Sequence, residues 1–154
     1  MRKAWVMGLF ATAALAGCAT AGPAATPSVS PAAETAPTEQ SDANTAFIVP
    51  RADGGGLIVG SSETTGIELY SLDGARIGAV ASGAAVGVNG RYGAPSTNGW
   101  TLATIDGATN QLRLFELDAE AGAARERTAR PIPVGFAAES LCLYRDARDT
   151  TLYA

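Results

Sequence analysis

Residues 66–73 read GIELYSLD, and residues 111–118, 45 positions further along the chain, read QLRLFELD. Both runs alternate apolar and polar residues, carry an aromatic residue at their fifth position and close on Leu-Asp. Alternation with a period of two indicates a β-strand. Leu57 and Leu102, which open the preceding apolar runs, repeat the same offset. A period of about 40 to 50 residues with four strands per unit is typical of β-propeller blades. Two unrelated hairpins of a β-sandwich are the alternative.

Short apolar runs bounded by turn residues extend this pattern over the rest of the chain. Regular strand spacing without amphipathic helical stretches predicts an all-β fold. The predicted strands cover residues 46–49, 57–60, 67–71, 76–80, 85–88, 101–105, 111–117, 131–134 and 141–144. The predicted turns lie at Asp73-Gly74, Asn89-Gly90, Asp106-Gly107 and Gly122.

The length of the chain admits two complete units, and residues 151–154 resemble the opening strand of a third. Propellers close with about four to eight blades, so two blades would leave open strand edges. We therefore expect a partial β-propeller of about two blades plus the start of a third, at the front of a longer protein. Its partners would be further blades or a following catalytic propeller.

The first residues have the three parts of a signal peptide: a cationic start, an apolar run over residues 4–16 and the tetrapeptide LAGC at 15–18. The run is shorter than the ~20 residues that a membrane-spanning helix needs. We predict a signal peptide at 1–17 and a lipid anchor on Cys18 that holds the protein in the cell envelope. By resemblance to the sorting rule of enteric bacteria, Ala19 favours the outer membrane. An ordinary secreted protein is the alternative.

Residues 18–45 are nearly all Ala, Thr, Pro, Ser, Glu and Gly, with no aromatic residue. Such a segment buries too little apolar surface to offset its ordering entropy. We predict a disordered linker between the anchor and a folded domain over residues 46–154.

Composition excludes several functions. The chain has no histidine, the commonest general base and a usual zinc ligand. Besides Cys18 the only cysteine is Cys142, so no disulfide can form within the processed chain. Because Cys142 lies in an apolar run, we predict a buried, inert thiol. The acidic balance, with net charge −4, predicts that the protein does not bind nucleic acid.

Residues 57–92 and 100–144, with the strings GIELYSLDG and SLCLYR, resemble the opening blades of β-propeller phytases. The resemblance covers residues 46–154. It implies a six-bladed fold and hydrolysis of inositol phosphates, the 3-phytase reaction. It also implies calcium ions that carboxylates hold at the mouth of the channel, where they neutralise phosphate charge and activate water.

The site residues that the resemblance implies are mostly replaced in this chain. Two calcium-binding carboxylates would fall in residues 43–49, which read ANTAFIV. A phosphate-facing lysine pair would fall on residues 63–64, which are Glu and Thr. Arg91 and Tyr92 match the family's Arg-Tyr motif and are the candidate phosphate-binding residues. The resemblance therefore implies a retained scaffold with most of its chemistry lost.

Three functions follow from these observations. The leading hypothesis is an envelope lipoprotein with a phytase-like propeller domain that is non-catalytic or assists a catalytic one. The second is calcium-dependent 3-phytase activity in the full-length protein. Glu63, Asp106 and Glu139 would then be the metal ligands, and solvated loop acids are the competing interpretation of the same residues. The third is a non-enzymatic envelope propeller used for binding or assembly.

Overall fold

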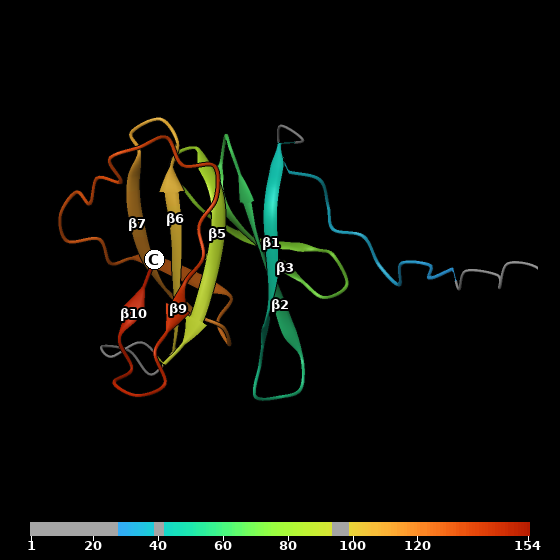
Figure 1. The fold of residues 1–154 in the computed structure, drawn as a ribbon. Helices are drawn as coiled ribbons and strands as arrows, with labels where there is room; N and C mark the ends of the chain where they lie inside the picture. Colours follow the sequence, from blue (N-terminus) through green and yellow to red (C-terminus); the bar gives the residue numbers. More distant parts are fainter. Residues whose placement is uncertain (1–27, 39–41, 94–98) are drawn as a thin grey trace, which may run out of the picture. The chain divides into compact units, whose positions relative to one another are not determined.

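The computed structural model of the protein describes residues 28–38, 42–93 and 99–154 (Figure 1). The chain divides into two units, Met1–Ser30 and Pro31–Ala154, and the strands belong to the second. The predicted signal peptide, Cys18 and the first part of the predicted linker lie outside the described residues. Within the described ranges, no helix has the length and apolar character needed to cross a membrane.

The described strands form three antiparallel sheets, and this confirms the all-β prediction. The first sheet has the order β1-β2-β3-β4, the second β5-β6-β7-β8, and the third is the pair β10-β9 (Figure 1). The strands are β1 (Ala43–Pro50), β2 (Gly56–Ser62), β3 (Gly66–Ser71), β4 (Arg76–Val80), β5 (Ala85–Tyr92), β6 (Trp100–Asp106), β7 (Gln111–Asp118), β8 (Ala123–Glu126), β9 (Tyr144–Arg145) and β10 (Leu152–Tyr153).

The first seven predicted strands lie within β1 to β7, whereas the two C-terminal predictions are wrong. Residues 131–134 make one isolated bridge, from Pro133 to Gln111, and only Tyr144 of residues 141–144 enters a strand. Proline has no backbone N–H to donate to a ladder, which limits pairing along this segment. Sequence reasoning also missed β8, whose residues AARE show no apolar alternation.

One face of each large sheet contributes to a single shared core. The side chains at the centre of this core come from both sheets and are almost fully buried. These residues are Val49, Leu57, Val59, Ile67 and Leu69 from the first sheet, with Val88, Leu102, Phe115 and Leu117 from the second. Because burial of each such side chain is worth about 1.5–3 kcal/mol, this core is the main source of stability.

The two sheets meet where β1 runs beside β5. Thr45 Oγ1 accepts a hydrogen bond from the backbone N–H of Val88 at 2.8 Å. Further along, a Cβ atom on Gly90 would lie only 2.6 Å from the Phe47 ring. The ring therefore occupies the space that any other residue at position 90 would need.

This close approach explains why the predicted turn at Asn89-Gly90 is wrong. Both residues lie inside β5, paired with Ala103 and Leu102 of β6. The Asn89 side chain accepts a hydrogen bond from the backbone N–H of Leu143 at 3.2 Å. An Asn-Gly pair usually marks a hairpin turn. Here Gly90 lets the strand pack closely against Phe47, and the Asn89 side chain binds the backbone of Leu143.

Leu143 also explains a second correction, at Cys142. The predicted buried thiol is exposed, because residues 141–143 do not form a strand and Leu143 fills the buried position instead.

A buried carboxylate lies on the face of the first sheet that points away from the shared core. Glu68 is fully buried and accepts hydrogen bonds from Thr65 Oγ1 at 2.5 Å, from the Tyr70 hydroxyl and from Arg76. Burial opposes ionisation of Glu68, but these bonds outweigh it and lower its pKa. Burial and the neighbouring carboxylate raise the pKa of Tyr70 to about 12.

Part of the predicted linker contacts the first sheet. The backbone N–H of Ala36 donates to the carbonyl of Gly74 at 2.8 Å, and Ser62 Oγ at the end of β2 donates to Asp42 Oδ1 at 2.8 Å. Residues 43–45 of the same segment already belong to β1.

We predict that Gly90→Ala lowers the free energy of unfolding by about 1–3 kcal/mol, because the added methyl group overpacks the Phe47 contact. Urea denaturation measures the loss. Gly60→Ala is the matched control, since a Cβ there would meet its nearest neighbour at an ordinary 3.8 Å. Phe47→Leu should restore part of the stability of Gly90→Ala, and equal stability of the two alanine variants would contradict the close approach.

We also predict that Glu68 makes stability depend on acid pH. The folded-state pKa of Glu68 lies below its ordinary value of 4.5, so its contribution is complete above about pH 4.5 and is lost as pH falls through the folded pKa. Glu68→Gln should remove this component and cost about 1–3 kcal/mol at neutral pH. Denaturation midpoints between neutral and acid pH test this, with the exposed Glu139→Gln as control. An unchanged acid profile in Glu68→Gln would show that the carboxylate is not ionised in the fold.

Candidate functional site

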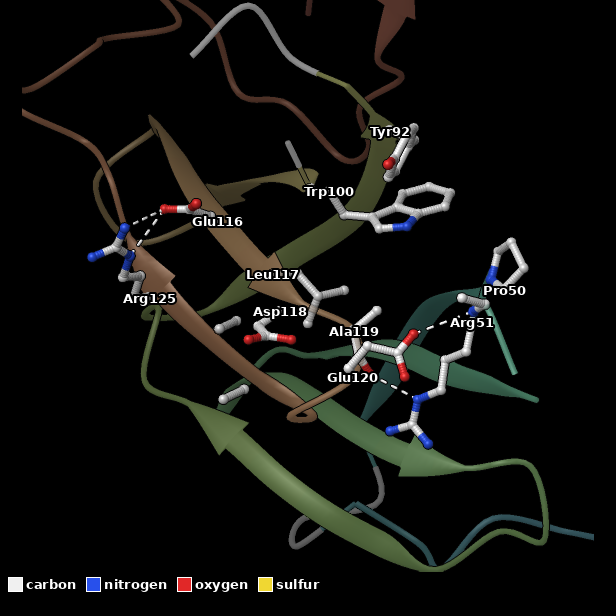
Figure 2. A pocket seen from close by; sticks show the side chains of 14 residues that line it. Pro50, Arg51, Tyr92, Trp100, Glu116, Leu117, Asp118, Ala119, Glu120 and Arg125 are labelled. Atoms are coloured by element: carbon white, nitrogen blue, oxygen red, sulfur yellow. Dashed lines mark hydrogen bonds and ion pairs between the residues drawn. The ribbon is translucent and has the colours of Figure 1, made fainter. Parts of the chain in front are cut away.

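A groove of about 1020 Å³ lies where β1, β5 and β7 end (Figure 2). This volume is at the upper end of the ~300–1,000 Å³ usual for small-ligand sites. Residues 50–52, which follow the body of β1, line it from the first sheet. Strands β5 to β8 of the second sheet supply the remaining lining. The groove is therefore built at the junction of the two sheets.

Tyr92 and Trp100 form the aromatic wall of the groove. They are register partners across β5 and β6, with ring centroids 5.9 Å apart and an interplanar angle of 65°. Phe47 supports Trp100 from within the core at a centroid distance of 6.4 Å, while Tyr92 remains 59% exposed. Strand pairing and core packing thus fix two amphipathic rings at the groove.

Arg51 and Glu120 form a second wall. Arg51 Nε donates to the carbonyl of Ala119 at 2.7 Å, and the backbone N–H of Ala52 donates to Glu120 Oε1 at 3.2 Å (Figure 2). These bonds tie the end of β1 to the turn between β7 and β8. Among the described residues, the two Nη atoms of Arg51 have no hydrogen-bond partner, so they remain available to a ligand.

The groove carries two cations, Arg51 and Arg125, and three carboxylates, Glu116, Asp118 and Glu120. Arg125 Nε and Nη2 both donate to Glu116 Oε2, at 2.9 and 2.6 Å, so this pair neutralises itself. Asp118 Oδ1 accepts from the backbone N–H of Ala121 at 2.9 Å. The lining is therefore slightly acidic, with one cation available to a ligand.

The candidate phosphate-binding residues fall on or beside this groove. Tyr92 lines it. Arg91 Nη1 donates to Asn89 Oδ1 at 3.1 Å and to the carbonyl of Gly90 at 2.8 Å. These internal bonds hold the Arg91 guanidinium against its own strand.

The candidate metal ligand Asp106 lies at the other end of the second sheet. It pairs with Ala85 at the start of β5, whereas Tyr92 ends that strand. At ~3.3 Å per residue, the seven intervening steps separate the two positions by roughly 20 Å. The structure thus does not bring Asp106 and Tyr92 together in one site.

The candidate metal ligands also take part in local interactions. Asp106 accepts from the N–H of Ala108 at 3.0 Å and from Thr109 Oγ1 at 2.9 Å, within the turn after β6. Glu63 accepts from Asn44 Nδ2 at 3.1 Å, and Glu139 is exposed. In the part of the chain that the structure describes, no three His, Cys, Asp or Glu residues gather as metal ligands. Calcium binding by these three carboxylates stays a prediction.

Sequence reasoning missed Arg51 and Glu120. They lie in turns of different sheets, and only the contact between the sheets brings them together. The Tyr92–Trp100 pair was also missed, because the predicted strand ended at residue 88, whereas β5 continues to Tyr92 and pairs it with Trp100.

Comparison with models of known protein families and with curated proteins finds no match to this chain.

Proposed function

We propose that this chain is an envelope lipoprotein, anchored through Cys18, whose sheets are blades of a phytase-like β-propeller domain. The domain has a non-catalytic role, in which it binds a ligand or assists a catalytic partner. The stacking of its two large sheets supports the propeller part of this proposal. Its candidate site residues form hydrogen bonds with near neighbours, and this supports the non-catalytic part.

The observation that carries the proposal is the recurrence of one sheet arrangement along the chain. Strands β1 to β4 and strands β5 to β8 each form a four-stranded antiparallel sheet whose strands neighbour each other in chain order. Four-stranded sheets of this kind are the blades of a propeller. The spacing recurs as well, since Leu57 of β2 and Leu102 of β6, 45 residues apart, are both fully buried in the core that the two sheets share.

The polar groups support a role without catalysis. Phosphate-ester hydrolysis by calcium needs clustered carboxylates with open coordination positions, together with cations free to bind phosphate. Asp106 and Glu63 are used in local hydrogen bonds, and Arg91 is held by Asn89.

We predict that the purified chain, given calcium and phytate, releases no inorganic phosphate above a protein-free blank. A colorimetric phosphate assay measures this. Release that depends on calcium and disappears in Asp106→Asn would contradict the proposal and support calcium-dependent 3-phytase activity. One observation favours that alternative: Glu63 directly follows β2 and Asp106 ends β6, so the two carboxylates lie at corresponding ends of strands in the two sheets.

The lipid anchor has its own test. Expressed in a bacterial host with two membranes, the protein should partition with the membrane fraction and carry the added mass of a diacylglycerol. Cys18→Ser should move it to the soluble fraction, because one polar residue then replaces the acylated one. Cys142→Ser is the matched control and should stay with the membrane. Membrane association of Cys18→Ser would refute anchoring through this residue.

A further inference from the structure

We propose that the groove between Tyr92–Trp100 and Arg51–Glu120 is a binding site for a neutral oligosaccharide. This inference goes beyond the phytase-like assignment and does not depend on it, since it uses only the described residues that line the groove.

The first argument is the shape and polarity of the walls. One wall presents the Tyr92 and Trp100 rings, and the buried Leu117 lies between the walls. The other wall has the carboxylate of Glu120, and the guanidinium of Arg51 lies beyond it as seen from Trp100 (Figure 2). A ligand that fits has one apolar face to stack on the rings and polar groups along its other side.

The second argument is charge. The three carboxylates outnumber the two arginines, and Arg125 is already paired with Glu116. A multiply charged anion such as an inositol phosphate would meet net repulsion here. The carboxylates would attract a cationic ligand, but such a ligand offers no acceptor to Arg51, whose guanidinium is held in place by Ala119 and can only donate.

The third argument is the kind of hydrogen bond on offer. Arg51 can only donate, and the carboxylates of Asp118 and Glu120 can only accept. A hydroxyl group does both, so neighbouring hydroxyls of one ring can satisfy both kinds of partner at once. Pyranose rings combine such hydroxyls with an apolar face of C–H groups, and this is the combination that the groove requires.

The test follows the fluorescence of Trp100 in the full chain, in detergent. Trp5 lies in the predicted signal peptide, so Trp100 is the only tryptophan of the processed chain, and Trp5→Phe makes it the only tryptophan of the unprocessed chain as well. Chitotetraose, cellotetraose and maltotetraose are each titrated, with phytate as the anionic comparison. We expect a saturable change with at least one tetrasaccharide, nearly independent of salt because the ligand is uncharged.

Variants at Tyr92 identify the site. Tyr92→Ala removes one of the two stacking rings and should weaken binding by up to about tenfold. Tyr92→Phe keeps the ring and should restore most of the affinity, which separates stacking from any effect on folding. Tyr153→Ala is the matched control, because Tyr153 is similarly exposed, at 52%, and lies outside the groove.

Two outcomes overturn the proposal. One is the absence of any saturable response to the three sugars, or a response that Tyr92→Ala leaves unchanged. The other is phytate binding that weakens with salt and is lost in Arg51→Gln, without a response to sugars, which would identify an anion site. Neither outcome bears on phosphate release, so this proposal and the phytase-like one fail separately.

Discussion

The backbone of β5 passes directly against the ring of Phe47, and it can do so because residue 90 is glycine. The bond from Val88 to Thr45 fixes the same two strands a few ångströms away. This contact sets the distance between the sheets and lets Val59, Leu102 and Phe115 close over a common core. It also places Tyr92, two residues beyond Gly90, at the mouth of the groove. Core and groove are thus consequences of one close approach between strands.

Much of the fold was predictable because strands with one buried face leave a period-two pattern in the sequence. The runs around Ile67 and Leu112 show it, and the structure has strands there. Predictions from short stretches of sequence were wrong where a contact with another part of the fold determines the local structure. The Asn89-Gly90 pair has the composition of a turn, and only the neighbouring sheet shows that it lies within a strand. Strand β8 is held to β7 by backbone pairing and by the ion pair between Arg125 and Glu116. Neither interaction leaves an apolar pattern in the sequence.

The candidate site was less predictable, for a different physical reason. A family resemblance indicates which residue types occupy a position, but not what each side chain contacts. Arg91 matches a phosphate-binding motif, yet its guanidinium bonds to Asn89 and Gly90. Asp106 has a carboxylate suited to calcium, yet it accepts two bonds within its own turn. The groove needs residues from two sheets, so no local stretch of sequence encodes it.

The bond from Arg51 to the carbonyl of Ala119 crosses from one large sheet to the other, and the groove opens beside it. Any molecule held there touches both layers and must be released before they can separate. By mass action, its occupancy adds to the free energy that keeps the layers joined, growing with the logarithm of its concentration above the dissociation constant. A ligand would therefore act as a removable crosslink between the sheets. The free energy of unfolding of the domain would then report the concentration of the ligand.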